Sequence, residues 1–408
     1  MKKYKFVDLF AGCGGLEDGF LQSGRYEDIA AVEWLKPQVN TLVKRLQTKW
    51  GIADAEDRVL NFDIQREEEL FNGYKDAKFG ANKGLDCLVN KASGIDVIIG
   101  GPPCQAYSVA GRVRDEHGMK DDYRNYLFEH YCSVVARYKP LAFVFENVPG
   151  LLSATPDGTP SVERIRKGFR DIGYEIVDDL KKYARIDASD YGVPQARTRM
   201  VIVGLRQGCS SDVQSELHYF YQKTLPKYKT KKITVADAIG DLPPIYPSFD
   251  PEKHKDGNAY SVPETNITWH ASRYHSIRDM EIFKMLAEDI ESGRKEYVNS
   301  ERLSKLYEER VGSKSPIHRY HVLRPDIPST TIIAHLHKDG NRFIHYDSRQ
   351  ARSITVREAA RLQSFDDDFD FVGSRGNAYQ MIGNAVPPQL AKRVALALAD
   401  LMDIIKER

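Results

Sequence analysis

The feature that most constrains this chain is a strand, a glycine-rich loop and a helix that follow one another near its amino terminus. Residues 5–10 form a short segment typical of a strand, the loop 11–15 contains three glycines, and a helical pattern begins at Leu16. Such a loop lets the backbone approach a nucleotide-like ligand, because glycine lacks a Cβ and the amides at the helix start face the ligand. Glu17 stands where the dinucleotide fingerprint places its third glycine, which disfavours a pyrophosphate ligand.

Two further short strands are expected in this part of the chain, and each ends in an acid. Residues 29–32 lead to Glu33 and Trp34, and residues 58–63 end at Asp63. Glu33 stands about 20 residues after the glycine loop, where an acid in such folds accepts hydrogen bonds from a ribose. Either acid alone is more often a helix cap or a surface residue, but together they favour an adenosine ligand without a phosphate.

A fourth apolar run, residues 96–99, stops at two glycines and two prolines directly before Cys104. This pattern is typical of a buried strand that ends in a stiff loop, and open α/β sheets keep their ligand and catalytic groups at such strand ends. Cys104 could act there as a thiolate nucleophile. Alternatively, it could serve only as a small apolar residue that fills the turn. This stretch alone leaves both interpretations open.

Polar residues also stand beside two later strands. The strand expected at 141–145 leads into Glu146, and Gln195, Arg197 and Arg199 lead into the apolar run 200–204. Because alternate side chains of a strand share a face, we expect the latter three side chains to point the same way. Structural ion pairs are the alternative role for the two arginines.

The alternation of strands and helices fades in residues 208–341 and returns at Thr355, so we expect two domains. In the middle region helical periodicity is clear only at 279–291 and 301–310. Thr355, with Glu358 three residues later, predicts a capping box at a helix start. Two prolines at 387 and 388 predict the first turn of a final helix.

Composition excludes several classes of protein. Five cysteines without a Cys-x-x-Cys pair are expected to be reduced thiols, and the histidines at 318, 321, 335 and 337 lack further ligands at metal spacing, so no metal is expected. The absence of a long apolar run and of a secretion signal predicts a cytoplasmic protein. Five lysines within 223–232, interleaved with tyrosines, fit a contact with a phosphate backbone or, more commonly, a solvated loop.

Six segments of the chain, in order, resemble the motifs of the DNA (cytosine-5) methyltransferases of the bacterial and phage restriction-modification type. They are residues 8–15, 102–105, 146–148, 195–199, 355–363 and 383–386. The resemblance covers residues 4–205 and 345–400, whereas the middle region does not match a recognition domain with a known target.

The resemblance implies an α/β fold: a Rossmann-like S-adenosylmethionine-dependent methyltransferase sheet with helices on both faces, plus a smaller, loop-rich target-recognition domain. Residues 1–205 are then the catalytic and S-adenosylmethionine-binding domain and 206–345 the target-recognition domain, while 346–408 return to the catalytic domain. The implied cofactor contacts are Phe10, Ala11, Gly12, Cys13, Gly14, Gly15, Glu33, Trp34, Asp63, Ile64, Pro103, Asn384, Ala385 and Val386.

The resemblance also implies catalytic roles for Cys104, Glu146, Gln195, Arg197 and Arg199. The Cys104 thiolate would add to C6 of cytosine while Glu146, by a hydrogen bond or a proton at N3, takes up the charge pushed into the ring. Arg199 is the expected partner of the cytosine O2. The base must be flipped out of the duplex, because the chemistry cannot occur inside the stack.

Duplex DNA is the implied partner, and S-adenosylhomocysteine is the implied product. Residues 111–122 are the expected lid, with Ser108, Arg112 and Arg114 as DNA contacts, and Thr330 and Thr331 belong to a short threonine element that commonly abuts DNA. The middle region would read the sequence in the major groove. We expect a monomer in the bacterial cytoplasm, associated with the nucleoid and paired in function with a cognate restriction endonuclease.

Two alternatives remain. A tRNA methyltransferase of the same superfamily would share the catalytic residues, but that branch carries a Cys-Phe-Thr element that does not occur here. A catalytically silent, DNA-binding relative would have no use for a thiol at 104 and an acid at 146, and both are present.

Overall fold

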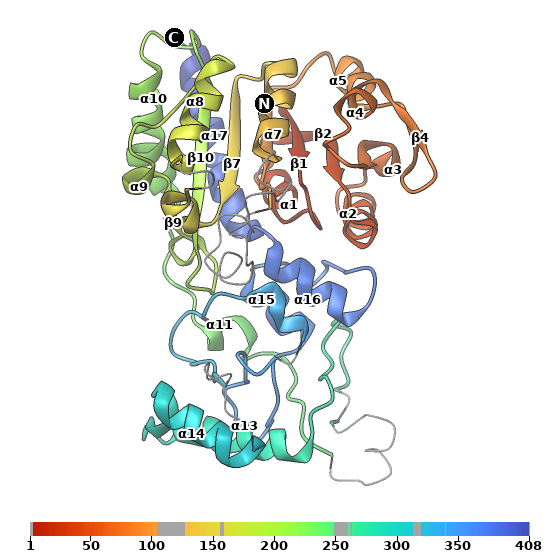
Figure 1. The fold of residues 1–408 in the computed structure, drawn as a ribbon. Coiled ribbons are helices and arrows are strands. Elements are labelled where there is room, and N and C mark those ends of the chain that lie inside the picture. Colours follow the sequence, from red (N-terminus) through yellow and green to blue (C-terminus); the bar gives the residue numbers. More distant parts are fainter. Residues whose placement is uncertain are drawn as a thin grey trace. The chain divides into compact units, whose positions relative to one another are not determined.

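The computed structural model describes residues 3–103, 127–155, 159–248, 260–261, 263–312, 320–338 and 340–407 (Figure 1). The chain forms two compact units. The first unit comprises Met1–Gly192, Arg197–Lys231 and Ala385–Arg408, and the second comprises Val193–Ala196 and Lys232–Asn384.

An eight-stranded sheet is the centre of the first unit. Its order is β3-β2-β1-β6-β7-β10-β8, and β9 also pairs with β10. The strands are β1 (Tyr4–Leu9), β2 (Tyr26–Glu33), β3 (Val59–Asn61), β6 (Val97–Gly100), β7 (Ala142–Asn147), β8 (Tyr174–Ile176), β9 (Arg185–Asp187) and β10 (Thr198–Arg206). The first five strands of this order are parallel, whereas β10 runs antiparallel to β7, β8 and β9. The strands expected from the apolar runs are confirmed.

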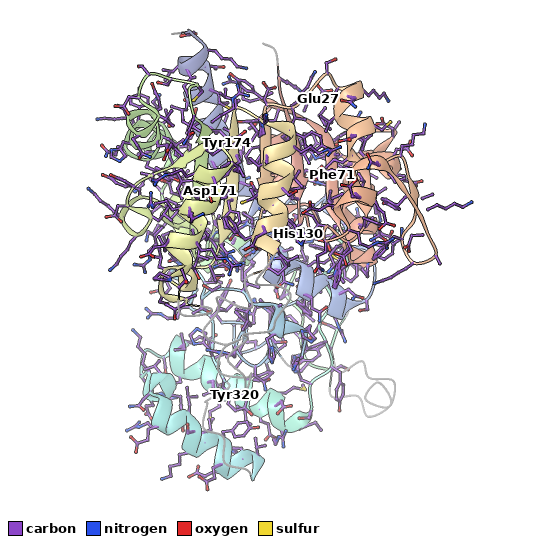
Figure 2. All side chains as sticks on the ribbon, turned by 45° about the horizontal axis from the view of Figure 1, so that its top comes forward. Glu27, Phe71, His130, Asp171, Tyr174 and Tyr320 are labelled. Carbon is purple, nitrogen blue, oxygen red and sulfur yellow. The ribbon has the colours of Figure 1, made fainter. Side chains whose placement is uncertain are left out.

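Helices cover both faces of this sheet, which confirms the expected α/β class. They are α1 (Gly15–Gln22), α2 (Lys36–Thr48), α3 (Ala55–Arg58), α4 (Glu67–Asn72), α5 (Leu85–Lys91), α7 (Leu127–Tyr138), α8 (Ser161–Asp171), α9 (Leu180–Tyr183), α10 (Val213–Tyr219) and α17 (Pro388–Glu407), and a hairpin of β4 (Tyr74–Asp76) and β5 (Gly80–Asn82) stands beside them. On one face, Phe169 of α8 stacks on Phe143 of β7 at 4.1 Å. Tyr174 donates its hydroxyl to Pro140 O at 2.6 Å (Figure 2).

Two helices that are distant in the sequence pack closely in this unit. A Cβ placed on Gly19 of α1 would lie 2.4 Å from both the Cβ of Ala391 and the carbonyl oxygen of Pro388 in α17. Glycine at this position therefore lets the last helix of the chain lie against the helix that follows the glycine loop.

The packing divides the chain differently from the expected domains. Residues 206–231, expected in the recognition domain, belong to the first unit. The reason is that the hydroxyl of Tyr221 accepts a hydrogen bond from Val203 N and donates to Val201 O, both at 2.9 Å on β10. Tyr228 also donates to Asp400 of α17 at 2.9 Å.

The second unit consists mainly of helices and connecting segments. Within its described residues the α-helices are α11 (Val235–Ile239), α13 (Ile277–Glu291), α14 (Ser300–Val311), α15 (Val356–Leu362) and α16 (Arg375–Asn384). Tyr320 (Figure 2) is buried with Phe283 and Leu286 of α13 and with Leu303 and Leu306 of α14 in one hydrophobic core. The helices expected at 279–291 and 301–310 are thus confirmed.

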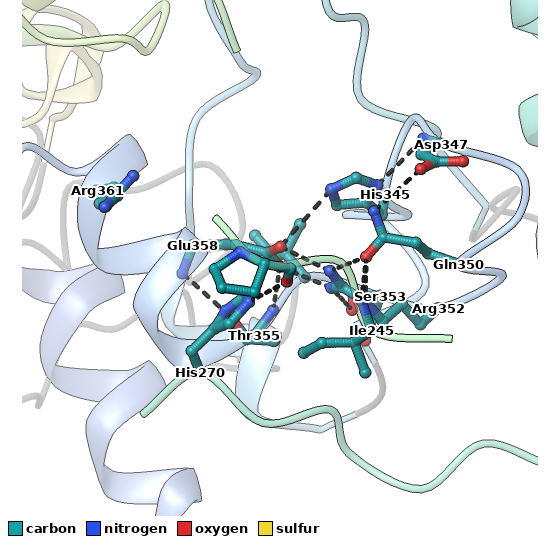
Figure 3. A network of polar contacts seen from close by, with 12 residues as sticks. Ile245, His270, His345, Asp347, Gln350, Arg352, Ser353, Thr355, Glu358 and Arg361 are labelled. Carbon is teal, nitrogen blue, oxygen red and sulfur yellow. Dashed lines mark hydrogen bonds and ion pairs between the residues drawn. The ribbon is translucent and has the colours of Figure 1, made fainter. Parts of the chain in front are cut away.

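A buried polar network organises residues 345–358 of this unit (Figure 3). Arg352 donates to both carboxylate oxygens of Glu358 at 2.7 Å, and each side chain is 1% exposed. The capping box is confirmed, because Thr355 N donates to Glu358 at 2.7 Å and Glu358 N donates to Thr355 at 3.1 Å. These bonds place residues 346–384 in the second unit, and only Ala385 onward returns to the first.

No helix within the described ranges is both long enough and apolar enough to span a membrane. The same residues contain no group of three or more histidine, cysteine, aspartate or glutamate side chains arranged to hold a metal ion.

Candidate cofactor and catalytic site

The glycine loop and the end of β2 are joined by the carboxylate of Glu33. One oxygen of Glu33 accepts a hydrogen bond from Gly12 N at 2.9 Å, and the other accepts one from Leu35 N at 2.8 Å. Burial raises the pKa of Glu33, while these backbone donors lower it. Each carboxylate oxygen can accept a second bond, so Glu33 still has acceptor capacity for the hydroxyls of a ribose.

The loop itself leaves room for a ligand. Gly12 has φ +58°, and a Cβ placed on it would meet no heavy atom within 4 Å among the described residues. Phe10 also has positive φ, at 59°, a backbone conformation that L-residues rarely adopt. Cys13 is buried, and this burial raises the pKa of its thiol to about 12, so Cys13 is unsuited to act as a nucleophile.

An exposed aromatic ring follows Glu33. Trp34 is 40% exposed, and the amide of Asn61 at the end of β3 donates to Glu33 O at 3.1 Å and to Trp34 O at 2.9 Å. Asp63 accepts a hydrogen bond from Gln65 N at 3.1 Å, and Ile64 is buried. An exposed indole beside a carboxylate and an open glycine loop fits an adenosine-bearing ligand. The sequence analysis did not identify Asn61 as a candidate site residue. Its position at the end of an expected strand could have indicated it.

The carboxyl-terminal motif reaches the glycine loop through its backbone. A Cβ on Gly15 would lie 2.4 Å from Val386 O and 3.1 Å from the Cβ of Ala385, so only glycine permits this approach. Ala385 O also accepts a hydrogen bond from the Arg197 guanidinium at 3.1 Å. Asn384 is exposed at the end of α16 and belongs to the second unit.

Glu146 of β7 and Arg199 of β10 form an ion pair between two paired strands. Nε of Arg199 lies 3.0 Å from Oε1 of Glu146, and each side chain is 13% exposed. Burial raises the pKa of Glu146, and the positive charges of Arg199 and Arg197 oppose this rise. A carboxyl group with a raised pKa is suited to give a proton or a hydrogen bond to a ring nitrogen near neutral pH.

The loop that leads towards Cys104 lies against this pair. A Cβ on Gly101 would lie 2.8 Å from Oε2 of Glu146, and the amide of Asn147 donates to Pro102 O at 3.5 Å. Pro103 is exposed. Glu146 therefore lies directly beside the backbone that positions the next residues of the loop.

Gln195 and Arg197 do not belong to the strand that was expected to align them with Arg199. The strand β10 begins at Thr198, so of these three residues it contains Arg199 alone. Gln195 is buried in the second unit, where its amide donates to Leu362 O and Gln363 Oε1 and accepts from Ile332 N.

Several expected site residues lie outside the described residues. They are Cys104, Ser108, Arg112, Arg114 and the expected lid at 111–122. Thr330 is exposed, and Thr331 donates its hydroxyl to Ala196 O at 2.8 Å.

The lysine-rich segment belongs to the first unit as far as Lys231, and two of its exposed lysines form ion pairs there. Lys227 lies 3.7 Å from Asp400, and Lys229 lies 3.5 Å from Asp190. Part of its positive charge is therefore neutralised within the protein.

The chain is similar to known proteins over nearly its whole length. A family model described as C-5 cytosine-specific DNA methylase matches residues 4–400. The type II methyltransferase M.Bpa9945I of Bacillus paralicheniformis is 32% identical, over 97% of this chain and 99% of its own length. M.ApeKI of Aeropyrum pernix, named a DNA (cytosine-5-)-methyltransferase, is 29% identical over 99% of this chain and 100% of its own.

Solved structures share the fold. A putative DNA modification methyltransferase encoded within an E. coli prophage has a TM-score of 0.62 and 24% identity, covering 98% of this chain and 100% of that chain. The S. pombe Dnmt2 methyltransferase has a TM-score of 0.53 and 15% identity, covering 99% of each chain.

The fold is thus one that the chain shares with solved methyltransferases. Within that class, the chain belongs to the C-5 cytosine-specific DNA methylase family. It is a DNA (cytosine-5-)-methyltransferase related to the type II methyltransferases of restriction-modification systems.

Proposed function

We propose that this enzyme methylates C5 of a flipped-out cytosine in a specific duplex DNA sequence through a covalent bond between Cys104 and C6. The observation that carries the proposal is the partly buried Glu146–Arg199 ion pair beside Gly101, on the loop that leads to Cys104. An acid with a raised pKa next to a guanidinium matches the N3 and O2 edge of cytosine.

S-adenosylmethionine, when bound, supplies an electrophilic methyl group. The chain would hold its adenosine part with Glu33, Trp34 and Asp63 around the open loop at Gly12. The remaining cofactor contacts are Phe10, Ala11, Cys13, Gly14, Gly15, Ile64, Pro103, Asn384, Ala385 and Val386. The backbone approach of Val386 to Gly15 supports this set.

The chemistry of the cytosine falls to three side chains. The Cys104 thiolate adds to C6, and Glu146 gives N3 a hydrogen bond or a proton, so that C5 gains the character of an enamine carbon. Arg199 bonds O2 and keeps the charge of Glu146 in balance. After C5 has gained its methyl group, loss of the C5 proton and expulsion of the Cys104 sulfur restore the aromatic ring.

The DNA has to be held while one base is extruded, at a cost of a few kcal/mol for unstacking and unpairing. The DNA would be contacted by three residues that follow Cys104 in the sequence, namely Ser108, Arg112 and Arg114. Its backbone would be contacted by Thr330 and Thr331. The second unit would read the sequence. We further propose a monomer that acts in the bacterial cytoplasm on nucleoid DNA beside a cognate endonuclease.

Methyl transfer from labelled S-adenosylmethionine tests the function directly. Duplex DNA should be labelled at cytosine C5, Cys104→Ala should abolish the labelling, and tRNA should remain unlabelled. Labelling of tRNA but not of duplex DNA would favour the tRNA methyltransferase, and no labelling of either would favour a silent DNA-binding relative.

A second experiment tests the covalent step. Duplex DNA with 5-fluorocytosine at the target should trap the protein covalently, because fluorine cannot leave as the C5 proton does. Wild-type enzyme that methylates ordinary DNA but forms no such adduct would exclude the Cys104–C6 bond.

A further inference from the structure

Four residues of the chain, Val193–Ala196, are built into the second unit although the residues on both sides of them, Gly192 and Arg197, belong to the first. They pair with the threonine element, residues 329–332, as a short parallel bridge between Gln195 and Ser329. Ser329 N donates to Pro194 O at 2.9 Å, and Ala196 N donates to Ser329 O at 2.8 Å. Backbone hydrogen bonds thus hold the threonine element against the residues that directly precede Arg197.

The side chain of Gln195 joins three segments of the second unit. Its oxygen accepts a hydrogen bond from Ile332 N at 2.9 Å, and its Nε2 donates to Leu362 O at 3.1 Å and to Gln363 Oε1 at 2.5 Å. Gln195, Ile332 and Gln363 have no solvent exposure. An amide that makes three buried hydrogen bonds is costly to remove, because each partner would be left unsatisfied.

The threonine element itself has one face towards the protein and one towards solvent. Thr331 donates its hydroxyl to Ala196 O at 2.8 Å, whereas Thr330 is exposed. The bonds of Gln195 and Thr331 therefore fix the backbone from which Thr330 extends.

We propose that Gln195 is a positioning residue that fixes the threonine element for contact with the DNA backbone, and that it does not touch the cytosine. This inference rests on the proposed function, because it takes duplex DNA as the substrate. Residues 193–196 continue directly into Arg197 and, two residues later, Arg199. The bonds that hold the threonine element therefore lie next in the sequence to these two arginines.

The two roles for Gln195 predict different losses. A residue that touches the flipped base contributes to affinity only when the base is present. A residue that fixes a backbone contact contributes equally whether the target nucleotide carries cytosine or no base, because phosphate contacts position the DNA without reading it.

The test compares Gln195→Met, which removes all three bonds at similar volume, with the wild type. The target sequence is first identified as the sequence that becomes methylated in a host expressing this chain. The affinity of each protein for an unmethylated duplex with this sequence is then measured in the presence of S-adenosylhomocysteine. It is measured again for the same duplex with an abasic target nucleotide. We expect a loss of about tenfold for both duplexes. Affinity for S-adenosylmethionine should remain within about twofold, since Glu33, Trp34 and Asp63, which would hold its adenosine part, lie in the other unit.

Two further variants make the test specific. Gln363→Met removes one of the hydrogen bonds of Gln195, so it should lower affinity for both duplexes by a smaller factor. The test therefore does not depend on whether Gln195→Met folds. Gln207→Met, at an exposed glutamine that bonds Glu175, is the matched control and should leave both affinities unchanged.

A loss confined to the cytosine duplex would overturn the inference, because it would place Gln195 at the base. No loss for either duplex, or a parallel loss of S-adenosylmethionine affinity, would overturn it as well. Failure of the proposed function has a different signature: wild-type protein itself would then neither methylate the duplex nor bind it more tightly than an unrelated sequence.

Discussion

Nε of Arg199 on β10 lies 3.0 Å from Oε1 of Glu146 on β7, and the two strands run antiparallel with Glu146 opposite Val201. The pair thus joins two motifs that are distant in the sequence. Burial raises the pKa of Glu146, and the guanidinium of Arg199 opposes that rise, so the carboxyl group is protonated more readily than an exposed glutamate.

Replacing Glu146 with Gln should remove the proton that the acid gives to N3 while keeping its shape. We expect kcat to fall about a hundredfold or more, with little change in affinity for DNA or S-adenosylmethionine. Single-turnover methylation and equilibrium binding measure the two effects. Glu163→Gln, at an exposed acid on α8, is the control and should retain wild-type kcat. Equal losses in both variants would contradict a catalytic role for Glu146.

Arg199→Met should alter the pH dependence of the reaction. Removing the guanidinium removes a charge that lowers the pKa of Glu146, so this pKa rises further. If the protonated acid is the active form, activity is lost as pH rises through its pKa, and this loss should move to higher pH in the variant. The pH profile of kcat/KM measures it. Activity that is gained rather than lost as pH rises, with this gain moved to higher pH in the variant, would show that the ionised form is active.

Glu33→Ala should weaken cofactor binding. The carboxylate holds Gly12 N and Leu35 N and offers acceptor capacity to a ribose, so we expect affinity for S-adenosylmethionine to fall about 10- to 100-fold. Calorimetric titration measures this affinity. Glu27→Ala is the matched control, because Glu27 (Figure 2) is an exposed acid on the same strand β2. A similar loss in both variants would point to damage to the sheet rather than to a lost contact.

Acid should destabilise the second unit through its buried histidines. Burial lowers the pKa of His275 to about 3 and that of His345 to about 4. Between pH 6.5, the ordinary histidine value, and pH 4, the unfolded chain binds protons that the folded histidines do not. Each histidine should then cost about 1.4 kcal/mol of unfolding free energy per pH unit as pH falls through this window. Urea denaturation at several pH values measures the slope, and His345→Gln should reduce it.

A buried acid beside the glycine loop should have the opposite pH dependence. Neither carboxylate oxygen of Glu17 has a hydrogen-bond partner among the described residues, and burial raises its pKa well above the ordinary value. A raised folded pKa means that stability is lost as pH rises. Glu17→Met should therefore raise the free energy of unfolding by about 1–3 kcal/mol at pH 8 and by less at pH 5. A larger gain at pH 5 than at pH 8 would contradict this assignment.

Local patterns in the sequence predicted the elements and several close contacts. The apolar runs predicted the strands, because a buried strand needs a continuous apolar stretch. The Thr355–Glu358 capping box was equally visible, since it depends on residues three apart. The ion pair of Glu146 with Arg199 was not predicted, because it depends on the pairing of β7 with β10.

Residues whose partners are remote in the sequence could not be assigned in this way. Gln195 was grouped with Arg197 and Arg199 by its spacing, but its amide bonds Ile332, Leu362 and Gln363. Residues 206–231 were expected in the recognition domain, but Tyr221 and Tyr228 bind them to β10 and α17. No local pattern indicates which remote backbone group a buried polar side chain will satisfy.

The sequence by itself therefore determined the α/β alternation, the glycine loop, the polar residues at the strand ends and, by resemblance, the family. The tertiary structure alone decided where the chain passes from one compact unit to the other and which of the spaced polar residues share a site. The physical reason is that hydrophobic periodicity and capping act over a few residues, whereas buried hydrogen bonds and ion pairs are formed only once distant segments pack together.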